Sequence, residues 1–232
     1  MLFFDPLYLV IAAPALLLSL WAQMRVKSAF AQYGEVANRR GLTGADAARR
    51  ILQVAGLGAV RIETAQGFLS DHYDPREKVL RLSADVYGRA TLAAVGVAAH
   101  EAGHALQDAQ GYHAMRWRAT LVPVASLGSK LAMPILIFGF LLQAAALVKV
   151  GVLLFAGVVA FQLVTLPVEF DASSRAMRAL DGAGVLAADE LPGARAVLNA
   201  AAMTYVAAAV AAVGQLVYFL LRSGLLGGSR DE

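Results

Sequence analysis

Four long apolar runs alternate with polar stretches along the 232 residues of the chain. They cover Leu7–Ala22, Leu131–Val148, Val150–Val168 and approximately Ala201–Leu221. A helix needs about 20 predominantly apolar residues to cross the hydrocarbon core of a bilayer, and flanking residues can complete the shortest run. The pattern therefore predicts a mainly α, polytopic membrane protein, a helical bundle with about four transmembrane helices.

The first run and the two middle runs predict how the chain crosses the membrane. Met1–Pro6 lacks the basic residues of a signal peptide, so the first run is expected to be an uncleaved membrane anchor. Lys149 is the only charge between the two middle runs, which predicts a transmembrane hairpin with Lys149 at its outer tip and a kink at Pro134. A hairpin returns the chain to the side that it left, so the residues after Val168 should share a side with those before the hairpin.

The polar region between the first run and the hairpin has the pattern of a small α+β domain. Alternating apolar and polar residues predict two half-buried strands, and Thr or Ser residues ahead of apolar segments predict helix starts. The expected elements are a helix over Gly44–Val54 capped by Thr43 and stopped at Gly56, strands at Val60–Glu63 and Val79–Leu82, a turn at Ser70–Pro75 between them, a short helix over Ala84–Tyr87 capped by Ser83, and a helix that begins at Thr91.

Composition and charge agree with a membrane protein and suggest its orientation. Hydrophobic residues make up 59% of the chain, and its mean hydropathy is +0.60. Between Gln23 and Thr120, thirteen Lys and Arg residues stand against nine acidic ones, so the positive-inside rule predicts a cytoplasmic location for this region. The net charge of +3 is explained in the same way, and no aromatic-plus-basic pattern predicts nucleic-acid binding.

One short motif in the last predicted helix of this domain carries metal chemistry. It is His100-Glu101-Ala102-Gly103-His104. Residues four apart lie on one face of a helix, so the two imidazoles can bind one metal ion, while Glu101 can act as a general base without being a ligand. The motif predicts a Zn²⁺ hydrolase that still needs a third ligand. The chain has no cysteine, so this ligand must be His, Asp or Glu.

Four acidic residues compete for the position of third ligand. Asp108 lies one turn beyond His104 and should point too far along the helix. Asp181, in the sequence Leu-Asp-Gly, is similar to the LDG motif of intramembrane site-2 proteases, although it follows a polar stretch here. Glu169 is favoured, because it comes where a membrane helix returns to the side of the histidines and a carboxylate there needs a partner. Asp171 is then expected to support a ligand or to form a salt bridge.

Three sequence blocks carry a resemblance that runs over most of the chain. The blocks His100–Gln107, Asp71–Arg76 and Pro167–Ser173 are similar to those of bacterial neutral zinc membrane metallopeptidases of the YugP type. This resemblance implies a multi-pass, zinc-dependent endopeptidase with His100, His104 and Glu169 as ligands. More distantly, the chain resembles HtpX-type membrane proteases and the gluzincins. Those proteins commonly place an aspartate four residues after the ligand glutamate, a position that Ser173 occupies here.

A peptidase of this kind also needs a donor for the oxyanion and a place for its substrate. His72, Tyr73, Tyr112 and His113 are candidates for the donor by residue type, and His72 is favoured because it precedes the second predicted strand. That strand, directly before the metal helix, could pair with an extended substrate along a free edge. An ordinary hairpin packed on a helix is the alternative.

The predicted function is that of a membrane-embedded zinc endopeptidase. It would hydrolyse peptide bonds of membrane-associated or misfolded proteins at the cytoplasmic face, with Glu101 as general base and with proteins, peptides and the lipid bilayer as partners. The alternatives are a site-2-type intramembrane protease and a non-catalytic, zinc-stabilised membrane scaffold. The sequence predicts no oligomeric state. The expected segments are an anchor (1–22), a cytoplasmic peptidase domain (23–120), a transmembrane hairpin (121–168), a cytoplasmic segment with the third ligand (169–200), and the last transmembrane helix with a tail (201–232).

Overall fold

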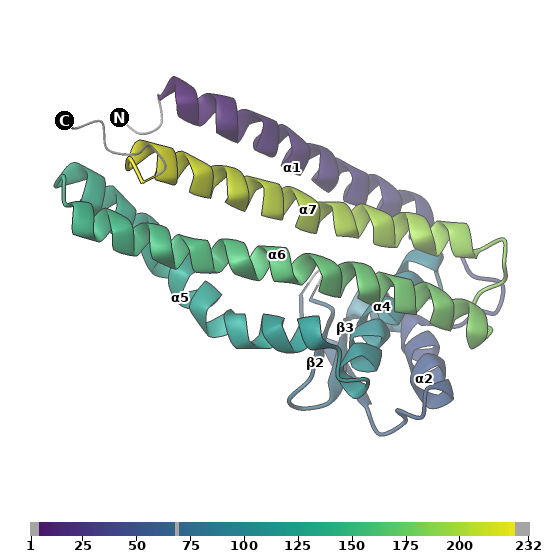
Figure 1. Cartoon of the computed structure of the whole chain (residues 1–232). Helices are drawn as coiled ribbons and strands as arrows, with labels where there is room; N and C mark the ends of the chain where they lie inside the picture. Colours follow the sequence, from purple (N-terminus) through teal and green to yellow (C-terminus); the bar gives the residue numbers. More distant parts are fainter. Residues whose placement is uncertain (1–4, 68–69, 226–232) are drawn as a thin grey trace. The chain divides into compact units, whose positions relative to one another are not determined.

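The computed structural model describes residues 5–67 and 70–225, which are mainly helical (Figure 1). Four of the helices, α1, α5, α6 and α7, are long and apolar enough to cross a membrane. The predicted number and class of long helices are therefore confirmed. The elements in order are α1 (Pro6–Tyr33), α2 (Gly44–Val54), β1 (Arg61–Ala65), β2 (His72–Asp74), β3 (Val79–Ser83), α3 (Ala84–Gly88), α4 (Leu92–Ala109), α5 (His113–Leu141), α6 (Ala145–Gly182) and α7 (Leu191–Arg222).

The chain divides into two compact units. The first consists of Met1–Trp21, Arg116–Pro167 and Thr204–Glu232, and the second of Ala22–Met115 and Val168–Met203. Each of the four long helices contributes one part of its length to the first unit and the other part to the second. The first unit therefore holds the most apolar segments, and the second holds α2, α3, α4 and the sheet.

Glycines allow the helices of the first unit to approach closely. A Cβ atom at Gly128 of α5 would lie 2.6 Å from the carbonyl oxygen of Leu154 on α6, and one at Gly139 would lie 2.9 Å from the backbone nitrogen of Val148. Small residues at such contacts are typical of membrane helices, which associate by close packing of their backbones. α5 and α6 thus form the predicted hairpin as a closely packed pair.

The turn of this hairpin does not lie at Lys149. α5 ends at Leu141 and α6 begins at Ala145, so the chain reverses over residues 142–144, where Gln143 adopts φ 52°. The prediction was wrong because the chain stays mainly hydrophobic through the turn, so the sequence pattern does not show where the backbone reverses. The positive φ of Gln143, which only the structure gives, marks the reversal. Lys149 lies inside α6 instead, near its start, and its long side chain can still extend toward an interface.

Three residues were predicted to cap helices in the second unit, and two of them, Thr43 and Thr91, do so. The Thr43 Oγ1 accepts a hydrogen bond from the Asp46 amide, the Asp46 carboxylate accepts one from the Thr43 amide, and α2 spans the predicted residues. Thr91 caps α4 through the amide of Ala94. The hydroxyl of Ser83 makes no capping bond, because it donates to the Asp71 carboxylate instead.

The sheet has three strands in the order β1-β3-β2. The two predicted strands exist as β1 and β3 and pair in parallel, while β2 pairs antiparallel with the other side of β3. β2 occupies His72–Asp74, inside the segment that was expected to be a turn. The strand that precedes the metal helix is consequently central, and it offers no free edge to a substrate; β1 and β2 are the edges.

A hydrophobic core holds the second unit together. Leu80 and Leu82 of β3 are fully buried, as are Ile51 of α2, Val95 of α4 and Leu180 of α6. The long, continuous course of α6 to Gly182 thus brings a segment that is distant in sequence into the same core as α4. This packing sets the position of the residues near Glu169 relative to the two histidines.

Candidate metal centre

α4 presents both histidines of the motif on one face. The helix runs uninterrupted from Leu92 to Ala109, and its Thr91 cap supports the first turn. The rings of His100 and His104 lie with their centroids 4.8 Å apart and their planes at 83°. Their spacing is therefore the one expected for two imidazoles on successive turns that aim at a common point.

α6 brings Glu169 to this point. Its carboxylate is almost completely buried, with 2% of the residue exposed. Glu169 Oε2 lies 3.1 Å from His100 Nε2 and 3.6 Å from His104 Nε2. One donor atom from each of the three residues lies within 4.8 Å of the other two, so the group could hold a metal ion.

The distances and the donor chemistry fit zinc. Zinc binds imidazole nitrogen at about 2.0–2.1 Å and carboxylate oxygen at about 2.0–2.2 Å in tetrahedral sites, so two ligand atoms of one site lie about 3.4 Å apart. The two nitrogen–oxygen distances of 3.1 and 3.6 Å lie on either side of this value. Two imidazoles and one carboxylate are also a ligand set that zinc uses in hydrolases.

A glycine inside the motif makes this geometry possible. A Cβ atom at Gly103 would lie 2.5 Å from the carbonyl oxygen of Ala172, closer than real Cβ contacts come. Only a glycine lets α4 approach α6 so closely at this level. The close approach allows the short side chain of Glu169, three residues before Ala172, to reach both imidazoles.

The other ring nitrogen of each histidine also has a partner. Ser173 Oγ lies 3.1 Å from His100 Nδ1, and Gln107 Oε1 lies 2.9 Å from His104 Nδ1. Histidine ligands of metals usually make such a bond, which holds the ring and leaves the second nitrogen for the metal. Ser173, four residues after Glu169, thus contacts a histidine of the cluster.

Asp171 supports the site indirectly, through its contact with Gln107. Its carboxylate accepts hydrogen bonds from Gln107 Nε2 (2.9 Å) and from Arg175 Nε. The two roles expected for Asp171 as alternatives, support of a ligand or a salt bridge, correspond to its contacts with Gln107 and with Arg175.

Buried acidic groups give the cluster a negative environment. Burial by itself lowers the pKa of His104, but the hydrogen bond to Glu169 and the charge of Glu101 raise it, and the pKa of His104 is raised overall. Glu101, next to His100 on α4, is itself buried, with 8% of the residue exposed. Two carboxylates beside two imidazoles therefore favour positive charge at this point, as a cation-binding site requires.

The other candidate ligands lie elsewhere. Asp108 accepts hydrogen bonds from the hydroxyl of Tyr73 (2.7 Å) and from the amine of Lys78. Asp181 follows Glu169 by twelve residues on the same helix, a rise of about 18 Å. Within the described residues, neither belongs to the group that could hold a metal ion.

The structure separates the four candidates for the oxyanion donor. His72 lies exposed on the edge strand β2, with Nδ1 2.8 Å from the carbonyl oxygen of Ser70. Tyr73 is buried and bonded to Asp108, and burial, followed by this bond, raises the pKa of its hydroxyl. The ring of Tyr112 lies against the Arg175 guanidinium, and His113 begins α5. The role of His72 stays a prediction.

Sequence reasoning missed Gln107 as part of the site. Gln107 is the last residue of the block His100–Gln107, but its residue type alone predicts no role. One signal was available, because Gln107 lies three residues after His104 and therefore on nearly the same face of the helix. The contact with Asp171 could not be foreseen, since it depends on how α6 packs on α4.

Two comparisons with known proteins give matches over nearly the whole chain. Residues 8–224 match the family described as "Putative neutral zinc metallopeptidase". The chain is 44% identical over 226 residues to "Putative membrane protease YugP" of Bacillus subtilis (strain 168), covering 97% of this chain and 99% of the relative. No solved structure matches the chain. On the family match over nearly its whole length and this identity, the chain belongs to the neutral zinc metallopeptidase family.

Proposed function

We propose that the protein is a membrane-embedded zinc endopeptidase in which His100, His104 and Glu169 hold the metal. The buried cluster of two imidazoles and one carboxylate carries this proposal, because its distances fit zinc and each imidazole has a supporting partner. When bound, zinc would supply Lewis acidity, which polarises a carbonyl group and makes a water molecule more acidic.

Glu101 is the proposed general base. It lies next to His100 on α4 but about 100° round the helix, so it can approach a reacting water without being a ligand. Its carboxylate would accept the proton of the attacking water and then donate it to the amine that leaves. The burial of Glu101 supports this role, because bulk solvent then has little access to the carboxylate that transfers the proton.

The number of ligands favours catalysis over a purely structural metal. Among the residues that the structure describes, the group contains three side chains that could hold an ion. Structural zinc sites are closed by four protein ligands, whereas catalytic sites keep one position for water or substrate.

We further propose that the site acts at the cytoplasmic surface on membrane-associated or misfolded proteins. The basic excess between Gln23 and Thr120 supports this side of the membrane. About 20 residues of α6 from Ala145 would fill the hydrocarbon core, so Glu169 would come about one turn beyond it. The matched relative carries the name of a membrane protease.

The decisive experiment compares purified full-length variants in detergent for zinc content and for cleavage of a casein-like substrate. Glu101→Gln should retain zinc and lose proteolysis. His104→Ala and Glu169→Ala should lose both. Asp181→Ala is the matched control for the acidic residue, because it changes a carboxylate on the same helix outside the cluster, and it should retain both.

The other outcomes identify the alternatives. If Glu101→Gln cleaves the substrate at the wild-type rate, the proposed mechanism is wrong. If the wild type binds zinc in the cluster but membrane fractions show no accumulation of full-length proteins in cells with Glu101→Gln, a zinc-stabilised scaffold is favoured. Cleavage of transmembrane segments alone would favour an intramembrane protease.

A further inference from the structure

Gln107 is the most completely enclosed polar side chain next to the cluster, with 0% of the residue exposed. Its amide group contacts three others. Oε1 lies 2.9 Å from His104 Nδ1, and Nε2 donates to the carbonyl oxygen of Val168 at 2.8 Å and to Asp171 Oδ2 at 2.9 Å. The side chain therefore joins a histidine of α4 to two oxygen atoms of α6.

These contacts determine which way the amide points. The NH₂ group of a glutamine has two donors, and the oxygen has none. Val168 O and Asp171 Oδ2 are both acceptors, so the group that faces them must be the NH₂ group. The oxygen of Gln107 must then face His104.

The orientation of the amide in turn determines the state of His104. An amide oxygen only accepts hydrogen bonds, so His104 Nδ1 must carry the hydrogen. His104 Nε2, the nitrogen that faces Glu169 Oε2, is then the atom that is left to bind a metal.

His100 has no comparable constraint at Nδ1. Its partner, Ser173 Oγ, belongs to a hydroxyl group, which can donate or accept. The contact holds the ring of His100 in place, but it does not select one tautomer. The Nδ1 atoms of the two histidines are thus supported in different ways, and the contact that selects a donor at Nδ1 is the one to His104.

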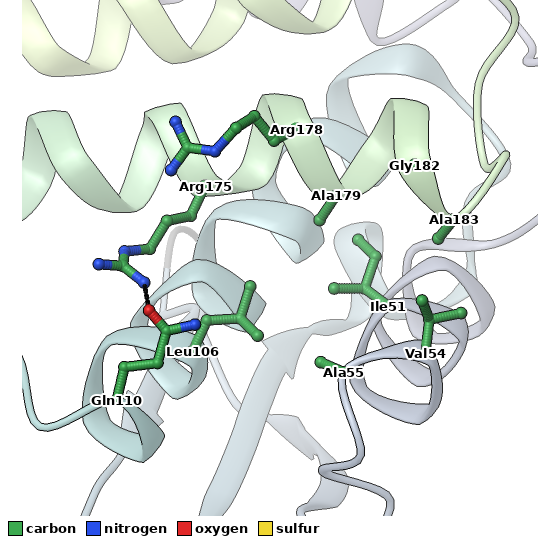
Figure 2. Close-up of a pocket in the computed structure, with 10 residues that line it drawn as sticks. All are labelled: Ile51, Val54, Ala55, Leu106, Gln110, Arg175, Arg178, Ala179, Gly182 and Ala183. Atoms are coloured by element: carbon green, nitrogen blue, oxygen red, sulfur yellow. Dashed lines mark hydrogen bonds between the residues drawn. The ribbon is translucent and has the colours of Figure 1, made fainter.

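Asp171 and Arg175 hold Gln107 from outside. Asp171 accepts from both Gln107 and Arg175, and Arg175 also donates to Gln110 Oε1 (Figure 2). Arg175 and Gln110 line a pocket of about 530 Å³. Figure 2 shows that this pocket lies between α6 and the α2 and α4 helices. The outer end of this chain of bonds is therefore open to the surface, while its inner end is buried.

We propose that Gln107 is a positioning residue that presets His104 for zinc, and that Asp171 and Arg175 keep Gln107 in the required orientation. This inference rests on the metal site proposed above. α4 and α6 each supply ligands. The hydrogen bonds from Gln107 to Val168 and Asp171 therefore also keep the ligands of the two helices in place before a metal binds.

The test is the zinc affinity of full-length Gln107→Leu, measured by chelator competition, together with the thermal unfolding of the metal-free protein. Leucine has a similar size and cannot accept from His104. We expect zinc affinity to fall by about 10- to 100-fold, the range found when the outer partner of a histidine ligand is removed. Gln53→Leu, an exposed glutamine of α2, is the matched control and should leave zinc affinity unchanged.

His104→Ala separates this inference from the proposed metal site. If His104→Ala binds zinc as tightly as the wild type, the metal site itself is wrong. If His104→Ala loses zinc while Gln107→Leu retains wild-type affinity, the metal site stands and the positioning role of Gln107 is wrong.

A second pair of variants applies if Gln107→Leu does not fold. Gln107→Glu places a carboxylate opposite Asp171 and removes both donors, so the metal-free protein should be less stable than the wild type. Adding Asp171→Asn supplies an amide that can donate to the new carboxylate, which can still accept from His104. The double variant should recover stability and bind zinc at least as tightly as the wild type. Zinc binding by the double variant that is 10-fold or more weaker would overturn the proposal.

Discussion

At the scale of single residues, the side chains at the cluster have two roles: some could bind the metal, and others hold the histidines in place. His100, His104 and Glu169 each direct one atom to a common point, and Ser173 and Gln107 each hold the opposite side of an imidazole. Such outer contacts raise metal affinity because the rings lose little freedom when the metal binds.

Ser173→Ala tests the weaker of these supports. Without the hydroxyl, the ring of His100 is less well held, and we expect zinc affinity to fall by about 10-fold with little change in unfolding temperature. Ser174→Ala is the control, because Ser174 Oγ accepts from Arg178 on the exposed surface. Equal affinities of the two variants in chelator competition would contradict a role for Ser173.

At the scale of secondary structure, the contact between α4 and α6 decides whether a site forms. Gly103 lets the two helices meet at the level of Ala172, and Gln107 bonds to the backbone of α6 at Val168. A small displacement of either helix would move Glu169 away from the histidines.

Gly103→Ala should disturb this contact and with it the metal site. The new Cβ would lie 2.5 Å from Ala172 O, a backbone atom that cannot move aside alone. We expect a loss of about 1–3 kcal/mol in the free energy of unfolding and strongly reduced zinc content. Gly96→Ala on the same helix is the control, because its Cβ would meet Ala194 at an ordinary 3.5 Å. Normal zinc content in Gly103→Ala would show that the close approach is not needed.

The capping box of α2 gives a prediction with a defined pH dependence. The hydrogen bond from the Thr43 side chain is the main cause that lowers the pKa of Asp46, and the charge of Arg49 adds to it. The folded protein thus has a lower pKa at Asp46 than the unfolded chain, in which it is about 3.9. The ionised carboxylate therefore stabilises the folded state above about pH 3.9, and this contribution is lost as the pH falls through the lowered value.

Asp46→Asn should accordingly reduce the free energy of unfolding by about 0.3–1 kcal/mol at pH 7, the usual contribution of a negative charge at a helix N-terminus. The difference from the wild type should shrink as the pH falls below about 3.9. Denaturant unfolding of the second unit, followed at both ends of this pH range, measures it. Asp85→Asn, which changes a carboxylate with no capping bond in the described residues, is the control. A difference that does not depend on pH would assign the effect to something other than the charge.

At the scale of the whole molecule, two features bear on the side of the membrane on which the site lies. α5 and α6 form a hairpin that reverses at residues 142–144, and α6 then continues beyond Pro167 to carry Glu169 in the second unit. A hairpin through a bilayer places its turn on the side opposite to the segments that enter and leave it. The topology that we propose, with a hairpin that crosses the bilayer, therefore predicts that labels at the turn and in α6 after Val168 are reached from opposite sides of the membrane.

Single cysteines test this arrangement, because the chain contains none of its own. Gln143→Cys lies in the turn and Asp181→Cys lies in the exposed part of α6 within the second unit. An impermeant maleimide should label the first variant only in right-side-out vesicles and the second only in inside-out vesicles. The reverse pattern would place the metal centre outside the cell, and labelling of both from one side would contradict the hairpin.

Much of this protein follows from its sequence alone, for local reasons. Apolar runs of sufficient length predict the four long helices, the Thr43 and Thr91 caps predict the starts of α2 and α4, and the spacing of His100 and His104 predicts a two-histidine face. Each depends on residues a few positions apart, where the geometry of a helix is known in advance.

Only the tertiary structure decided the rest, because it depends on contacts between distant segments. The hairpin turn lies at residues 142–144 rather than at Lys149, since backbone conformation and not charge sets it. β3 is central because β2 forms within a segment that resembles a turn. The bonds from Gln107 to His104 and Asp171 exist only once α6 lies against α4. The motif on α4 is therefore half of the site. The sequence also favours Glu169 for the other half, but only the packing of α6 on α4 brings its carboxylate to both imidazoles.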